Sequence, residues 1–120
     1  MEFDELSNRI IGSAIKVHKA LGPGFLESIY EAALVVQLRK DGMSVEAQKE
    51  VVIEYEGIQV GLHRLDLVVE GRVIVELKAS KAFEEINVAQ LLSYLKATGL
   101  KIGLLLNYGR PTLGIKRLLF

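Results

Sequence analysis

Residues 64–78 constrain the fold of this chain most, because three charged side chains interrupt two apolar segments there. The segments read as the strands of a β-hairpin, with aliphatic residues on both sides of a Glu-Gly turn signal. Asp66 lies on the incoming strand, and Glu76 and Lys78 lie on the outgoing one. Burial of an unpaired charge is costly. A divalent metal held between two carboxylates, with a lysine beside it, would explain all three residues.

The length of the hairpin loop decides whether the two acids meet. Glu76 and Lys78 are two residues apart on one strand, so they share a face. A two-residue loop pairs position 66 with position 75 and puts Asp66 on the face opposite Glu76. A purely structural hairpin without a metal predicts this arrangement. A three-residue loop that ends in Gly71 as a left-handed bulge pairs 66 with 74. Asp66 is then diagonal to Glu76, roughly 7–8 Å away. The metal hypothesis therefore predicts a bulge or an odd-length loop.

Composition limits the class of protein. A chain of 120 residues, 50% hydrophobic and 25% charged, is expected to form one globular domain over residues 1–120. It has no cysteine, which excludes disulfides, thiolate metal sites and a cysteine nucleophile, and which fits a reducing cytoplasm. An acidic N-terminus without a signal peptide, and no apolar run near the roughly 20 residues of a membrane span, predict a cytoplasmic protein with no membrane partner.

Hydrophobic periodicity and turn signals divide the chain into helices and strands. An amphipathic helix is expected at 4–21, ended by Gly22-Pro23-Gly24, and a second helix at about 26–40. An antiparallel meander of three strands follows, at about 45–55, 58–69 and 72–79. A third helix is expected at 84–97, and a strand buried on both faces at 102–106. The tail, 111–120, fits either a short helix or an edge strand. The order α-α-β-β-β-α-β predicts an α/β protein with a mixed sheet.

Several motifs in this order resemble a known superfamily. Asp66-(x9)-Glu76-Leu77-Lys78 across a hairpin resembles the core of the PD-(D/E)xK nucleases. Gly24-Phe-Leu-Glu27-Ser-Ile-Tyr30 resembles the signature of the GxxExxY protein family within it. Further matching phrases are at 17–24, 74–79 and 90–107, so the resemblance covers about residues 5–118. Leu65 replaces a loosely kept proline before Asp66, at a position without a chemical role.

The resemblance implies a restriction-endonuclease-like α-β-β-β-α-β core with an extra N-terminal helix. It also implies a Mg²⁺ or Mn²⁺ ion bound by Asp66, Glu76, the Leu77 carbonyl and Glu27, with Lys78 positioning or activating the attacking water. Gln90 and Tyr94 match the Gln-x-x-x-Tyr helix of RecB-like members, and their i, i+4 spacing puts both on one helix face. They would orient the substrate or the ligands of the metal.

Other polar residues have simpler explanations. A glutamate in the first turn of a helix, such as Glu27, also favours the helix dipole. Tyr30 is expected to be a core aromatic residue, and His18 a buried, hydrogen-bonded histidine rather than a ligand. His63 is expected to line the groove or to contact phosphate. Basic residues of the C-terminal third form a solvated face or a track for the phosphate backbone: Lys96, Lys101, Arg110, Lys116 and Arg117.

Two functions follow from the sequence. The first is a small Mg²⁺- or Mn²⁺-dependent nuclease that hydrolyses phosphodiester bonds of nucleic acid, with DNA preferred. The second is a catalytically silent module of the same fold that binds nucleic acid or a protein. Fifteen basic residues balance fifteen acidic ones, which counts against tight non-specific DNA binding by a monomer. A homodimer or a recruiting protein partner would compensate for the lack of net positive charge.

Overall fold

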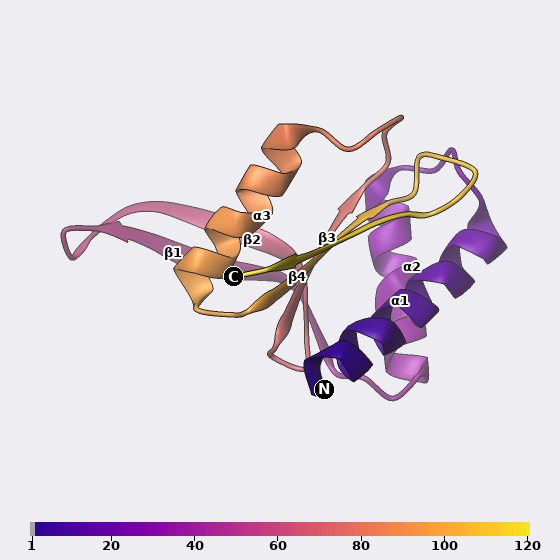
Figure 1. Ribbon diagram of the computed structural model, residues 1–120, viewed down its shortest axis with the longest axis horizontal. Helices are drawn as coiled ribbons and strands as arrows, with labels where there is room; N and C mark the ends of the chain where they lie inside the picture. The colour runs from indigo at the N-terminus through magenta and orange to yellow at the C-terminus, as the bar shows by residue number, and fades with distance from the viewer. Residues whose placement is uncertain (1) are drawn as a thin grey trace.

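The computed structural model describes the backbone of residues 2–120 and the side chains from Glu5 onward. Three helices and five strands follow the order α-α-β-β-β-α-β-β (Figure 1). Their bounds are α1 Glu2–Leu21, α2 Glu27–Lys40, β1 Val45–Tyr55, β2 Ile58–Val69, β3 Val73–Lys78, α3 Glu85–Thr98, β4 Ile102–Asn107 and β5 Gly114–Leu119. The expected α/β class and the core order are confirmed, and the ambiguous tail forms an edge strand.

The five strands form one mixed sheet in the order β1-β2-β3-β4-β5. β3 and β4 are parallel, and α3 is the crossover between them. The other neighbours are antiparallel, so β1, β2 and β3 form the expected meander. Every residue of β4 is buried, as expected for a strand covered on both faces.

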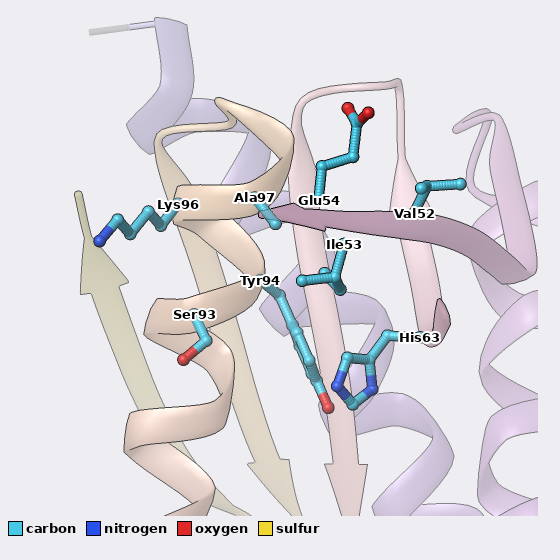
Figure 2. A pocket seen from close by; sticks show the side chains of 8 residues that line it. All are labelled: Val52, Ile53, Glu54, His63, Ser93, Tyr94, Lys96 and Ala97. Atoms are coloured by element: carbon cyan, nitrogen blue, oxygen red, sulfur yellow. The ribbon is translucent and has the colours of Figure 1, made fainter. Parts of the chain in front are cut away.

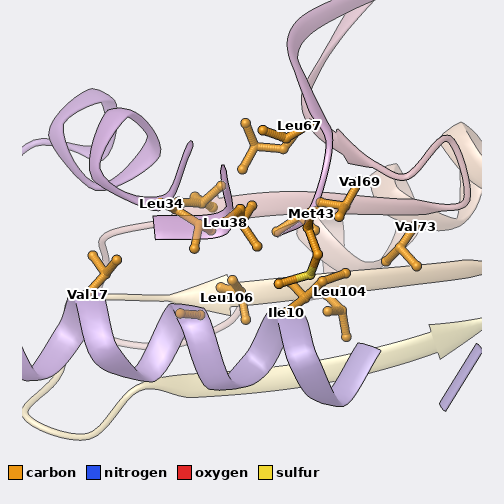
Figure 3. Close-up of a cluster of buried hydrophobic side chains, with 14 of the residues drawn as sticks. Ile10, Val17, Leu34, Leu38, Met43, Leu67, Val69, Val73, Leu104 and Leu106 are labelled. Atoms are coloured by element: carbon orange, nitrogen blue, oxygen red, sulfur yellow. The ribbon is translucent and has the colours of Figure 1, made fainter. Parts of the chain in front are cut away.

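Helices cover both faces of the sheet (Figure 1). α1 and α2 pack on one face and α3 packs on the other, and each face has its own hydrophobic cluster. Figure 3 shows the larger cluster, in which side chains of β2 and β4 meet those of the two N-terminal helices. Its central members include Ile10, Val17, Leu34, Leu38, Leu67, Val69, Leu104 and Leu106. Burial of each such side chain contributes about 1.5–3 kcal/mol.

The β1–β2 hairpin is longer than the rest of the sheet and extends beyond it (Figure 1). Its inner end, near Val45 and Val69, belongs to the core, whereas its outer end carries exposed hydrophobic residues. The projection contributes to an elongated shape of 46 × 30 × 23 Å. The boundary between the two ends lies near Asp66, where the candidate site is located.

Candidate functional site

The loop between β2 and β3 has three residues. Glu70 and Gly71 both have left-handed backbone conformations, with φ of 54° and 63°. The Arg72 N–H donates to the Val69 carbonyl at 3.0 Å and closes the turn. A left-handed pair at these two positions is typical of a type I′ turn, which matches the twist of the flanking strands. The expected odd-length loop is therefore present.

The register differs from the one expected. Val69 pairs with Val73 and Leu67 pairs with Val75, so this register, continued one residue beyond the ladder, places Asp66 opposite Glu76. The expectation that Asp66 pairs with residue 74 or 75 is wrong, because the turn ends at Arg72 and not at Gly71. Direct opposition brings the two acids closer than the diagonal arrangement. It also contradicts a purely structural hairpin with its two acids on opposite faces.

The two carboxylates bind the backbone where the strands separate. The Asp66 N–H donates to Glu76 Oε2 at 2.8 Å, and the Leu77 N–H donates to Asp66 Oδ2 at 2.9 Å. The paired ladder of β2 and β3 extends only as far as Leu67 and Val75. Each acid thus satisfies an N–H group on the opposite strand that the ladder leaves free. These contacts fix both carboxylates in place.

β2 also changes its facing at Asp66. Leu65 packs in the cluster under α3, whereas Leu67 packs in the cluster under α1 and α2. Residues two apart on a regular strand would share a face. On the neighbouring strand, Gln48 has a positive φ of 53°, and the ladder skips the pair between it and Asp66. This irregularity puts Asp66 at the junction of the two layers.

Burial raises the pKa of both acids, and repulsion from a neighbouring carboxylate adds to the rise, from Asp66 on Glu76 and from Glu27 on Asp66. Glu76 is only 8% exposed, and its pKa rises to about 8, first because of burial and then because of the nearby Asp66 charge. The hydrogen bond from Asp66 and the Lys78 ammonium oppose this rise. The pKa of Asp66 is raised too, chiefly by burial, while the Leu77 N–H and Lys78 lower it. Lys78 therefore acts electrostatically on both carboxylates, as expected for one cluster.

α2 brings two further carboxylates to this cluster. Glu27, in the first turn, accepts a hydrogen bond from the Ala79 N–H at 3.2 Å and raises the pKa of Asp66. Glu31 lies one turn later, and its pKa is raised by burial and by Asp66. Gln48 donates to Glu31 Oε1 at 2.8 Å. Sequence reasoning missed Glu31 and Gln48, although the i, i+4 spacing of Glu27 and Glu31 already put both acids on one helix face.

The two predicted residues of α3 have different surroundings. Tyr94 is 8% exposed, and its pKa is raised by burial, by Glu76 and by Asp66, so its hydroxyl lies near the acids. Its ring contacts the His63 ring, with centroids 5.0 Å apart. Gln90, one turn earlier, is exposed to solvent and lies outside these contacts. The structure thus brings together all the predicted site residues except Gln90.

Tyr30 and His18 have the structural roles expected from the sequence. The Tyr30 hydroxyl donates to the Gly22 carbonyl and accepts from the Phe25 N–H, which holds the loop before α2. His18 Nε2 donates to the Arg110 carbonyl at 2.8 Å. Both rings stack against the Tyr108 ring, with centroid distances of 4.5 and 5.6 Å. This aromatic stack connects α1 and α2 with the segment that follows β4.

The acid pair has the donor chemistry that a hard divalent cation prefers. Among the side chains from Glu5 to Phe120, no group of three or more His, Asp or Glu residues is arranged to hold a metal ion. Mg²⁺, however, usually keeps several waters and uses one or two carboxylates together with substrate phosphates. Asp66 and Glu76 form such a pair, and a cation would relieve the repulsion that raises both pKa values. The residues present therefore fit a Mg²⁺ or Mn²⁺ ion.

None of the helices within residues 2–120 is long and apolar enough to cross a lipid bilayer.

Comparison with known proteins agrees with this fold. The family model described as the PD-(D/E)XK nuclease superfamily matches residues 4–118. The crystal structure of SSO0001 is similar in fold, with a TM-score of 0.58 at 18% sequence identity. The similarity covers 77% of this chain and 48% of that one, so this chain spans about half the length of SSO0001. No curated protein matches. Because the family match covers almost the whole chain, the protein belongs to the PD-(D/E)XK nuclease superfamily.

Proposed function

We propose that this protein is a divalent-metal-dependent nuclease that hydrolyses phosphodiester bonds of nucleic acid, and that it is a GxxExxY member of its superfamily. The observation that carries the proposal is that Asp66 and Glu76 each accept a hydrogen bond from the backbone of the other's strand, with Lys78 two residues further along β3. Two neighbouring carboxylates with raised pKa values, one buried and one half-buried, are an unfavourable arrangement without a bound cation. Superfamily membership and the Gly24 to Tyr30 motif support the same assignment.

The residues have distinct roles in this proposal. Asp66, Glu76, the Leu77 carbonyl and Glu27 would hold Mg²⁺ or Mn²⁺. When bound, the metal would lower the pKa of a coordinated water and neutralise charge on the scissile phosphate. Lys78 places a fixed positive charge where negative charge develops on the phosphate oxygens. Tyr94 offers a hydroxyl donor beside the acids.

Hydrolysis forms one bond from a water oxygen to phosphorus and breaks the bond from phosphorus to the leaving sugar oxygen. The protein binds and orients the phosphate, and Lys78 holds the attacking water or stabilises the charge on the phosphate. Gln90, exposed on α3, would contact the substrate rather than the acids. DNA is the preferred substrate in this proposal.

A second candidate is a catalytically silent module that binds nucleic acid or a protein partner. The formal net charge of zero favours it, because most proteins that bind nucleic acid by themselves are basic. A homodimer or a recruiting partner would supply the missing attraction to the phosphate backbone. The two candidates differ in whether the bound metal leads to cleavage.

The deciding experiment separates metal binding from cleavage. Calorimetric titration with Mn²⁺ and Mg²⁺ is performed on the wild type and on Glu76→Gln, Lys78→Met and Glu85→Gln. Cleavage of labelled single- and double-stranded DNA and RNA is measured in the same buffers. Glu85 is exposed in the first turn of α3, so Glu85→Gln is the matched control for the loss of one carboxylate.

We expect Glu76→Gln to lose both metal binding and cleavage. Lys78→Met is expected to keep its metal affinity but to cleave about 10²–10³-fold more slowly, as is typical for removal of one group that stabilises transition-state charge. Metal binding without cleavage in the wild type would favour the silent module. No metal binding by the wild type at millimolar concentrations would refute the proposed site.

A further inference from the structure

A cavity of about 470 Å³ lies between the outer part of the β1–β2 hairpin and α3 (Figure 2). Its volume falls within the roughly 300–1,000 Å³ that is typical of sites for small ligands. Neither the proposed metal ligands nor Lys78 line it. The residues that do are Val52, Ile53, Glu54, His63, Ser93, Tyr94, Lys96 and Ala97.

Two aromatic rings form one wall of this cavity. The rings of His63 and Tyr94 are 5.0 Å apart and tilted by 57°. Figure 2 shows the Ile53 side chain next to these rings, directed toward Tyr94. Aromatic faces beside aliphatic side chains suit a flat, unsaturated ring. His63 itself is exposed, so one face of the pair is open to a ligand.

Charged groups lie on opposite rims. Lys96 is exposed on α3, and its side chain extends away from the cavity into solvent (Figure 2). Glu54 stands on β1, at the hairpin side. The Ser93 hydroxyl already donates to the Ala89 carbonyl at 2.9 Å. Lys96 is the cation among the lining residues and Glu54 the anion, so an anionic ligand would place its phosphate on the α3 side, away from the Glu54 carboxylate.

Tyr94 connects the cavity to the acidic site. Its ring forms part of the cavity wall, while Asp66 and Glu76 act electrostatically on its hydroxyl. His63, whose ring contacts Tyr94, precedes Asp66 by three residues on β2, so the cavity wall and the acid pair lie roughly 10 Å apart along the strand. For a nucleic-acid strand with one phosphate at Asp66 and Glu76, the adjacent nucleotide would reach the cavity.

We propose that this cavity binds one unpaired nucleobase beside the phosphodiester held at the acid pair, with the base against His63 and Tyr94 and its backbone phosphate near Lys96. The inference rests on the proposed function, whose substrate class it narrows. A base that stacks on protein rings must leave its own helix, either as part of a single strand or by flipping. The protein therefore prefers single-stranded or frayed nucleic acid to an intact duplex.

The test measures binding without cleavage. Fluorescence polarisation in EDTA follows a labelled 12-nucleotide DNA strand, the same strand in a duplex, and the same strand with abasic sites. Ala97→Leu fills the cavity from an exposed helix position, and His63→Ala removes one ring. Ala20→Leu makes the same change at an exposed position on α1, outside the lining residues, and is the matched control.

We expect the wild type and Ala20→Leu to bind the single strand at least about fivefold more tightly than the duplex and the abasic strand. Ala97→Leu and His63→Ala are expected to lose that preference. Equal binding by Ala97→Leu and Ala20→Leu would overturn the base site, whatever the cleavage assay shows. No binding of any of the three nucleic acids, together with binding of a labelled aromatic peptide that Ala97→Leu abolishes, would overturn it in favour of a protein partner. If Glu76→Gln loses cleavage but still binds the single strand, the base site does not depend on the metal site. Failure of one proposal can then be told apart from failure of the other.

Discussion

The Glu76 carboxyl makes the stability of the metal-free protein depend on pH. Its pKa is about 8 in the folded protein, against 4.5 for an ordinary glutamate. The folded state therefore holds this proton more tightly than the unfolded chain does, so its contribution is fully present below pH 4.5 and is lost as pH rises through 8. A shift of this size corresponds to at most on the order of 4–5 kcal/mol.

We expect the melting temperature of the metal-free wild type to fall between about pH 5 and pH 8 because of Glu76. Glu76→Gln keeps an acceptor for the Asp66 N–H, removes the charge, and should flatten that fall. Calorimetric melting curves at several pH values in EDTA provide the measurement. Glu85→Gln should retain the wild-type slope, since Glu85 is exposed. Identical slopes in Glu76→Gln and the wild type would contradict the raised pKa.

The sequence identified the main residues of the cluster but not all its members. Charges in apolar strands are unusual enough to single out Asp66, Glu76 and Lys78. Gln48 could not be found in this way, because its role depends on a positive φ that no glycine or turn signal announces. Glu31 could have been found from its helical spacing relative to Glu27. Its interaction with Asp66, however, depends on how α2 packs against the sheet.

At the scale of elements, local signals predicted each helix and strand better than their exact pairing. Breaks in hydrophobic periodicity gave the boundaries of the first seven elements within one or two residues, whereas the tail stayed open between a short helix and an edge strand. The β2–β3 register depended on whether the turn ended at Gly71 or Arg72, and both choices place a glycine in a left-handed position. The tail became β5 because β4 offered it an open edge, which is a tertiary effect.

The segments that follow β3 and β4 pack tightly together, and this contact can be tested. Asn107 Oδ1 accepts from the N–H groups of Ser80 and Gly109, both at 3.0 Å. A Cβ at position 109 would lie 2.3 Å from the Ser80 carbonyl oxygen, a backbone atom that cannot easily move. We therefore expect Gly109→Ala to lower the free energy of unfolding by about 1–3 kcal/mol, measured by urea denaturation.

Gly12→Ala is the matched control for this prediction. Gly12 lies inside α1, and a Cβ there meets no atom within 4 Å. Alanine in a helix interior is about 0.5–1 kcal/mol more favourable than glycine, so this variant should be more stable than the wild type. If Gly109→Ala were as stable as the wild type, the close contact between the two segments would not exist. The segment bearing Lys78 would then lack this support.

At the scale of the whole molecule, the core lies at one end and the outer β1–β2 hairpin at the other (Figure 1). α1, α2 and the buried strands β3 and β4 surround the larger hydrophobic cluster. α3 lies beside the outer hairpin, and the candidate base site lies between them. This division places the proposed substrate contacts on the less supported half of the molecule, as is common for binding elements.

The outer hairpin carries exposed hydrophobic residues, so its local stability shows whether a second copy of the protein covers them. They range from 49% exposure at Val52 to 69% at Tyr55, and they also include Ile58, Val60 and Leu62. In a monomer, few buried contacts hold this segment, so its amides should open locally at low cost. We expect residues 52–62 to exchange hydrogen for deuterium much faster than residues 73–78 and 102–107, which should exchange only on global unfolding.

Hydrogen exchange followed by mass spectrometry at several protein concentrations tests this expectation. The inner end of the same hairpin, residues 45–47 and 67–69, is the internal control, because it is hydrogen-bonded in the same ladder but packs in the core. Equal protection of both ends would contradict an open outer hairpin. Protection of residues 52–62 that increases with protein concentration would show that a second copy covers these side chains. In that case the outer hairpin would form the interface of a homodimer.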